Sequence, residues 1–245
     1  MIGSRLTLSM GLSAALLWGV PALAQPPVSF EAGYHATSRG LSAKAERSLR
    51  QSADQQFQLT NVLELRVLGA RLGRAEETST FRWEADVPIP VDYVYEQTGL
   101  GGRLETVSFD WNTAMAESRE DENLWELPLH PGVQDKLSFQ ALLAAQLVAG
   151  DRTEMTVDVV DNEQIETQLY RVIGAEVIET PLGRLNTLRV DRIREPDATR
   201  RTSFWLATDW SMLLARLVQV SGNGTETELL LETATVDGQP VTPLP

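Results

Sequence analysis

Residues 170–220 decide the fold, and they read YRVIGAEVIETPLGRLNTLRVDRIREPDATRRTSFWLATDWSMLLARLVQV. The stretch contains four apolar-rich runs separated by short turn signals, which are Thr180-Pro181-Leu182-Gly183, Glu195-Pro196-Asp197 and Thr208-Asp209. The runs are rich in Val, Ile, Leu, Thr and aromatic residues, which suit a pleated and half-buried surface. Because the gaps between the runs are short, consecutive runs are expected to pair as an antiparallel meander.

Alternation of apolar and polar residues continues on the N-terminal side of this stretch. It is longest over residues 57–67 and also covers residues 28–36. Residues 41–50 are interpreted as a strand paired with the first one, although residues 43–47 also fit a helical turn. Further strands are expected at residues 76–83, 91–96, 104–111, 115–125, 153–161, 164–174, 175–180 and 226–235. Pro88 and Pro90 are expected outside the interior of a sheet, because proline cannot donate to a strand ladder.

One helix is predicted at residues 135–149. Asp135 is suited to cap its N-terminus, apolar residues recur at helical spacing, and Gly150 follows its end. About a dozen strands with one helix predict an all-β protein. The expected architecture is an antiparallel open or closed barrel, or a strongly curved sheet, with the helix packed across the sheet or in one mouth of the barrel.

The N-terminal residues predict export from the cytoplasm. Residues 1–24 read as a signal peptide, with Arg5 before an apolar stretch and Ala22-Leu23-Ala24 as a cleavage site. The chain has no cysteine, so its fold contains no disulfide. We therefore expect a periplasmic protein with one β-barrel-like domain at residues 25–237 and a disordered tail at residues 238–245.

Charge and composition exclude several classes of partner. The formal net charge is −13 at pH 7, which argues against binding of nucleic acid and against docking on an anionic membrane surface. Beyond the leader no segment approaches the length of a membrane span, so an integral membrane protein is not expected. No cofactor is implied.

Sequence motifs give little support for catalysis. The two histidines, His35 and His130, lie far apart in the sequence, and there is no Gly-x-Ser-x-Gly motif. Without cysteine, two distant histidines do not predict a zinc site. A hydrolase using a pair of carboxylates stays open as an alternative, because 34 acidic residues allow many pairs.

Several segments resemble an uncharacterised family of bacterial periplasmic proteins, domain of unknown function 3108. The resemblance rests on residues 134–139 (QDKLSF), residues 180–183 (TPLG) with Arg189-Val190, residues 204–209 (FWLATD), residues 88–95 and Phe109-Asp110-Trp111. Where such families often have Leu-Pro-Val after the tryptophan strand, this chain has Leu213-Leu214-Ala215. The resemblance implies a periplasmic location and a barrel-like β fold. It implies no activity.

Two groups of residues are candidates for ligand binding. Arg192, Arg194, Arg200 and Arg201 lie close together in an acidic chain and could hold a phosphate or carboxylate. The alternative is ordinary cross-strand pairing with neighbouring acidic residues on the solvent face. Trp111 and Trp205 could line the mouth of an apolar cavity, or they could belong to the core.

These observations favour a non-enzymatic binding or carrier protein for an apolar or amphiphilic envelope molecule, such as a lipid. The first alternative is a structural or assembly factor that binds another envelope protein through an exposed sheet edge. The second alternative is a hydrolase of the cell envelope.

Overall fold

The computed structural model describes residues 26–52, 54–67, 70–99, 101–150 and 153–245. The signal peptide predicted at residues 1–24 lies outside these residues. The N-terminal half of the described chain contributes strands β1 (Phe30–Ser38), β2 (Leu41–Gln51), β3 (Phe57–Val67), β4 (Ala70–Glu84), β5 (Val87–Gly99), β6 (Arg103–Asp110), β7 (Met115–Glu120) and β8 (Asn123–Pro128). The remaining elements are helix α1 (Ser138–Val148), strands β9 (Glu154–Asp161), β10 (Gln164–Thr180), β11 (Gly183–Ile193) and β12 (Arg201–Ala207), the short 3-10 helix η1 (Thr208–Trp210), and strands β13 (Leu213–Val220), β14 (Glu226–Val236) and β15 (Gln239–Pro240).

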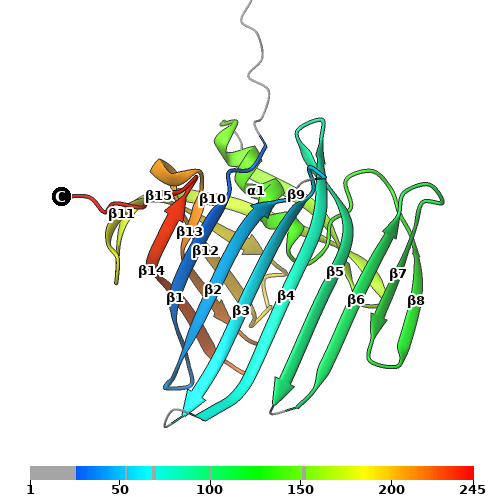
Figure 1. The fold of residues 1–245 in the computed structure, drawn as a ribbon, viewed down its shortest axis with the longest axis horizontal. Helices are drawn as coiled ribbons and strands as arrows, with labels where there is room; N and C mark the ends of the chain where they lie inside the picture. The colour runs from blue at the N-terminus through cyan, green and yellow to red at the C-terminus, as the bar shows by residue number, and fades with distance from the viewer. Residues whose placement is uncertain (1–25, 53, 68–69, 100, 151–152) are drawn as a thin grey trace, which may run out of the picture.

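The strands of the described chain form one fifteen-stranded sheet in the order β8-β7-β6-β5-β4-β3-β2-β1-β14-β13-β12-β11-β10-β9, with β15 added beside β14. Neighbouring strands in this order are antiparallel, and the predicted meander of β10 to β13 is confirmed. The pairing of β1 with β14 joins the two halves of the chain. The prediction of an all-β, strongly curved antiparallel sheet with one helix is therefore confirmed (Figure 1).

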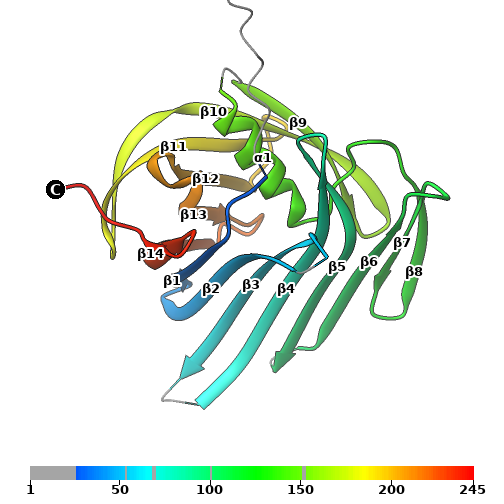
Figure 2. The ribbon, with the colours of Figure 1, turned by 45° about the horizontal axis from the view of Figure 1, so that its top comes forward.

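The sheet curls around α1, which lies in one mouth of the curl (Figure 2). In the described residues the end strands β8 and β9 do not pair with each other. Instead, the backbone of Gln134 bonds to the edge of β9 at Asp158 and Val160, with N···O distances of 2.8 and 2.9 Å. Its side chain donates to the carbonyl of Pro88 on β5 at 3.0 Å. One buried glutamine thus connects β9 to β5.

Strands β6 to β8 extend beyond this junction and cover part of β9. Val159 and Val160 are both buried but belong to different core clusters, because successive residues of a strand face opposite sides. Val159 faces the interior of the curl with Tyr170 and Phe204. Val160 packs with Val107 of β6, which places the overhanging strands on the outer side of β9.

The prolines of β5 correct one prediction. Pro88 and Pro90 lie inside β5, paired with Trp83 and Phe81 of β4. The pairing of β5 with β6 begins only at Asp92, so this end of β5 has a strand on one side alone. On the other side the carbonyl of Pro90 accepts a hydrogen bond from the indole of Trp111 at 2.7 Å, as that of Pro88 does from Gln134. The N–H groups that the prolines lack would have pointed to this unpaired side, so no strand ladder loses a hydrogen bond.

Other boundaries differ from the predicted ones for local reasons. Residues 115–125 form two strands, because the chain reverses at Asp121, whose φ is 51°. Residues 164–180 form the single strand β10, which absorbs a bulge between Val172 and Gly174. Helix α1 starts at Ser138, three residues after Asp135. The Asp135 carboxylate accepts hydrogen bonds from the amides of Leu137 and Ser138, at 2.8 and 2.7 Å, just where the helix begins.

The C-terminal residues 238–245 are ordered against the sheet, contrary to the expected disorder. Val241 is buried, and its amide donates to the carbonyl of Ala234 at 2.9 Å. The amide of Leu244 donates to the backbone carbonyl of Arg184 at 2.8 Å. A buried apolar residue between two backbone hydrogen bonds holds this segment in place.

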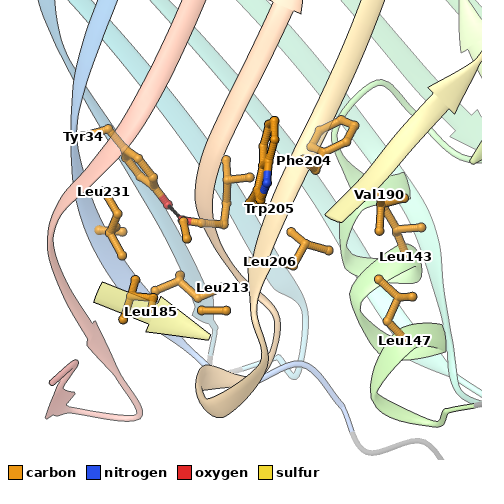
Figure 3. Close-up of a cluster of buried hydrophobic side chains, with 14 of the residues drawn as sticks. Tyr34, Leu143, Leu147, Leu185, Val190, Phe204, Trp205, Leu206, Leu213 and Leu231 are labelled. Carbon is orange, nitrogen blue, oxygen red and sulfur yellow. Dashed lines mark hydrogen bonds between the residues drawn. The ribbon is translucent and has the colours of Figure 1, made fainter. Parts of the chain in front are cut away.

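The core of the curl is apolar around α1. Figure 3 shows part of it, with Leu143 and Leu147 on the helix and Leu206, Leu213 and Leu231 on the strands. Tyr34 is buried and donates to the carbonyl of Leu214 at 2.9 Å. Burial raises the pKa of Tyr34 to about 12, with a smaller opposing effect of Arg47, so its hydroxyl remains a donor. None of the described helices is long and apolar enough to cross a bilayer.

Candidate functional site

A cavity of about 500 Å³ lies inside the curl, bounded by α1 and by strands from both halves of the sheet. We call it the polar cavity because charged side chains line it, although apolar atoms make up the larger part of its surface. Its volume falls within the range of about 300–1,000 Å³ that is usual for small-molecule sites. The aromatic part of its wall consists of Tyr95, Phe139, Tyr170 and Phe204. Phe139 of α1 stacks on Tyr170 of β10, with ring centroids 5.4 Å apart, so the helix and the sheet form one continuous wall.

Cationic side chains dominate the ionisable groups of this cavity. Arg192, Arg194 and Arg200 line one side, and Arg47 and Lys136 contribute from β2 and from the segment before α1. Arg192 and Thr202 are partners across β11 and β12, and Arg194 donates to the Thr202 hydroxyl at 3.4 Å. The turn between these two strands therefore gathers three arginines that the sequence analysis selected.

The acidic partners of these cations are unevenly distributed. Arg192 is paired with Glu166 at 2.7 Å, and Lys136 is held by Glu105 and Asp161 at 2.7 and 2.8 Å. No ion pair between described residues involves Arg47, Arg194 or Arg200. Burial, followed by the neighbouring charges of Arg192 and Arg200, lowers the pKa of Arg194. Of these three guanidinium groups only that of Arg192 is in contact with a carboxylate of a described residue, Glu166.

Arg47 is the most enclosed of the cavity cations, with a residue exposure of 8%. Its Nη1 donates to the Gln140 side-chain oxygen of α1 at 2.9 Å. Its Nε is buried and has no hydrogen-bond partner. Burial lowers the pKa of Arg47, while Tyr34 and Glu77 act in the opposite direction. A buried N–H without a partner is costly, and it is a group that a ligand oxygen could satisfy.

Carboxylates also reach the interior. Glu77 lines the cavity and accepts from Tyr93 and Asn61 at 2.8 and 3.0 Å. Burial, and to a smaller extent the charge of Asp135, raise the pKa of Glu77. Asp135 is fully buried and accepts from Ser79 at 2.6 Å, and burial raises its pKa as well. Both carboxylates are occupied by structural hydrogen bonds.

A second, apolar pocket of about 140 Å³ adjoins the polar cavity. It lies between α1, the β12–β13 connection and the N-terminal residues Pro26–Val28. Its wall is formed mainly by Phe30, Leu49, Leu59, Ala141, Leu143, Ala145, Leu206, Met212 and Leu213. Arg47, Gln140 and Phe204 line both spaces. The apolar pocket and the polar cavity are therefore neighbours, and these three residues form the boundary between them.

The remaining candidates lie elsewhere. Arg201 is exposed and lines neither space. The ring of Trp205 lies between the guanidinium groups of Arg189 and Arg216, 5.1 and 4.6 Å from its centroid, and its indole N–H donates to Glu176. Trp111 stacks on Phe109 at 6.0 Å. Neither tryptophan lines the cavity or the apolar pocket.

Sequence reasoning overlooked Arg47, Gln140 and Phe204. A signal for Arg47 was present, because residues 45, 47 and 49 occupy the inward phase of β2 and Arg47 is the single charge among them. Gln140 carried no such signal, since a polar residue on a predicted helix is ordinarily assigned to solvent.

The histidines lie outside the interior. His35 is exposed on β1, and His130 is exposed in the turn before α1, 3.4 Å from Asp158. Within the described part of the chain, no group of three or more His, Asp or Glu residues is arranged to hold a metal ion.

Comparison with known proteins identifies the family. The family described as "Protein of unknown function (DUF3108)" matches residues 33–231. The chain belongs to the DUF3108 family. The match spans every strand and helix that lines the two compartments, apart from the N-terminal end of β1 and the residues before it and the C-terminal end of β14. Among curated proteins, nothing matches this DUF3108 chain.

Solved structures similar to this chain include one with a shared fold. It is the beta-barrel-like protein of DUF1849 from Brucella abortus, with 11% identity and a TM-score of 0.56, covering 85% of this chain and 98% of that one. At this identity the likeness concerns the fold alone. The MucA/MucB complex of Pseudomonas aeruginosa also matches, with 11% identity over 88% of this chain and 91% of that one. Its TM-score of 0.18 does not show a shared fold.

Proposed function

We propose that this protein is a non-enzymatic periplasmic binding or carrier protein for an amphiphilic molecule of the cell envelope. The observation that carries the proposal is the shared wall of Arg47, Gln140 and Phe204 between an apolar pocket and a polar cavity. An amphiphile has the same division, with an apolar chain joined to a polar head. The signal-peptide pattern at residues 1–24 supports export to the periplasm.

The apolar pocket is suited to an acyl chain. Its wall is dominated by aliphatic side chains, and the residues that α1 contributes to it are all apolar except Gln140. Transfer of a methylene group from water into such surroundings stabilises a complex by about 0.8 kcal/mol. The pocket alone is small, so a long chain would have to extend into the polar cavity or displace the N-terminal residues 26–28 that line it.

Calorimetric titration of the mature protein with 1-lauroylglycerol tests this proposal. We expect saturable binding that is lost in Ala145→Phe, because a phenyl ring at this buried position fills the apolar pocket. Ala149→Phe is the matched control, since Ala149 is exposed at the end of α1 and does not line the pocket. Absence of binding by 1-lauroylglycerol and by its anionic counterpart 1-lauroyl lysophosphatidic acid would contradict the proposal.

A second candidate function is the binding of another envelope protein at the edge of the sheet. Among the described residues, β8 pairs with β7 alone, and an edge with free backbone groups can accept a strand from a partner. Substituting Leu124 of β8 with a photo-crosslinking amino acid tests this candidate in cells. A specific crosslinked partner would favour this candidate. If the variant, expressed at its natural level, crosslinks to no other protein, the result would count against it.

A further inference from the structure

We propose that the ligand has an anionic head group of the phosphate or carboxylate class, and that Arg47, Arg194 and Arg200 bind this group. The inference rests on the function proposed above and names the chemistry of the polar end. Three observations carry it: the absence of acidic partners for these arginines, the enclosed and unsatisfied Arg47, and the reversal of charge between the protein and its interior.

The ion pairs of the cavity divide its cations into two groups. Arg192 and Lys136 are neutralised by Glu166, Glu105 and Asp161 at distances below 3 Å. Arg47, Arg194 and Arg200 make no ion pair with any described residue, although Glu46 and Glu77 also line the space. Glu77 is engaged by Tyr93 and Asn61. Three guanidinium groups therefore remain for an external anion.

Arg47 gives this space a defined binding group. It is buried, it donates one hydrogen bond to Gln140, and its Nε has no partner. The Nε of Arg192 is likewise buried without a partner. Folded proteins rarely leave such donors unsatisfied. An oxyanion has several acceptor lone pairs, and a guanidinium group binds phosphate or carboxylate through two parallel N–H bonds.

The cationic interior contrasts with the chain as a whole. The protein has a formal net charge of −13, so a remote anion experiences repulsion that salt screens. Inside the curl, however, five cationic side chains line the cavity beside three acidic ones, Glu46, Glu77 and Asp161. Arg200 is exposed and lines the cavity, so the cationic cluster reaches solvent at this side. A head group can enter past Arg200 and Arg194 and reach Arg47, which also lines the apolar pocket, so the chain can lie in that pocket.

The two lauroyl probes separate this inference from the proposed function. 1-Lauroyl lysophosphatidic acid and 1-lauroylglycerol carry the same chain and differ by one phosphate. We expect the phosphate-bearing probe to bind at least about tenfold more tightly, because hydrogen bonds to charged groups are stronger than neutral ones. Arg194→Gln and Arg200→Gln should each reduce this advantage about fivefold or more, because they weaken binding of the phosphate-bearing probe more than binding of 1-lauroylglycerol.

Arg201→Gln is the matched control. It removes the same charge from the adjacent residue, but Arg201 does not line the cavity, so its variant should keep the full preference for the phosphate. Arg194 is half-buried and Arg200 is exposed, so the test avoids the buried Arg47, whose loss could disturb folding. Circular dichroism of all three variants verifies that they fold.

Each outcome distinguishes the two proposals. Equal binding of the two probes, or an equal loss in the Arg200 and Arg201 variants, would overturn the anionic head group and leave the carrier function standing. Binding of neither probe would overturn both. Glycerol 3-phosphate is titrated as a third probe, because it carries the phosphate without an acyl chain. If it binds as tightly as the lauroyl phosphate, the anion site stands and the amphiphile is replaced by a free phosphate compound.

Discussion

Arg47 of β2 and Gln140 of α1 are joined by a hydrogen bond of 2.9 Å at the boundary between the apolar and the cationic compartment. This contact attaches the helix to the N-terminal half of the sheet. It also orients the guanidinium group of Arg47, whose Nε is buried and unsatisfied. The position of the helix and the position of the cation are therefore set by the same pair of side chains.

Replacement of Gln140 by alanine should destabilise the protein by about 1–3 kcal/mol, because a buried donor of Arg47 loses its acceptor. Urea denaturation of the two proteins measures the difference in the free energy of unfolding. Gln146→Ala on the same helix is the control and should change it by less than about 0.5 kcal/mol, since Gln146 makes no hydrogen bond to another described side chain or backbone group outside the helix. Equal effects of the two substitutions would mean that the contact is unimportant.

Lys136 connects the overhanging strands to the β9–β10 turn. Its amino group contacts Glu105 of β6 at 2.7 Å, Asp161 at 2.8 Å and the Asn162 side chain at 2.8 Å. Burial by itself would lower the pKa of Lys136, but the hydrogen bonds to Asp161 and Glu105 raise it above its usual value. The amino group therefore stays charged throughout the neutral range.

Substituting Lys136 with methionine should reduce the free energy of unfolding by about 2 kcal/mol, because Glu105 is buried and loses one of its two cations. The figure allows for the partial exposure of the lysine. Arg119→Met, which breaks an exposed pair with Glu117, should cost less than about 1 kcal/mol. A Lys136 variant as stable as the Arg119 variant would show that the overhanging strands are held by apolar packing alone.

Glu77 should make the stability depend on pH in a defined direction. Its pKa is raised in the folded protein, mainly by burial, above a value of about 4.3 in the unfolded chain. The folded state then binds the proton more tightly than the unfolded state. The contribution of Glu77 to stability is present in full below pH about 4 and is lost as pH rises through the raised pKa.

The comparison with Glu77→Gln isolates this effect. Groups that do not interact with Glu77 titrate equally in both proteins, so the stability of the wild type relative to the variant should fall as the pH is raised from 4 to 7. Urea denaturation at several pH values gives the two curves. Parallel curves would show that Arg47 and the hydrogen bonds of Tyr93 and Asn61 already offset the burial of Glu77.

The sequence predicted the strand pattern but not how the two ends of the curled sheet meet. Alternation reports which face of a strand is buried, and turn residues report where the chain reverses. Neither reports that Gln134 would connect β9 to β5, or that β5 would lack a second neighbour beside Pro88 and Pro90. Both depend on how far the sheet curls, which is a property of all the strands together.

The candidate site was predictable to the extent that it is local in sequence. Arg192, Arg194 and Arg200 lie around one turn, so their spacing alone brings them together. Arg47 comes from a remote strand, and its approach depends on the curl. Arg201 is exposed, and the two tryptophans are packed away from the cavity wall, Trp205 in the buried core and Trp111 against the second buried cluster. Alternation along a strand does not specify which side chains meet once the sheet curls.

The neighbouring residues Phe204 and Trp205 of β12 should separate ligand binding from stability. Phe204 lines both interior spaces, whereas Trp205 is held between Arg189 and Arg216 and lines neither. Phe204→Leu should therefore weaken binding of the lauroyl probes about fivefold or more through lost contact with the chain. Trp205→Phe should leave the affinity unchanged and lower the free energy of unfolding by about 1–2 kcal/mol, because it loses the bond to Glu176 and weakens the cation–π contacts. Calorimetric titration and urea denaturation of the same two variants measure both quantities. A loss of affinity in Trp205→Phe that matched the loss in Phe204→Leu would show that affinity follows the stability of β12 rather than contact between Phe204 and the ligand.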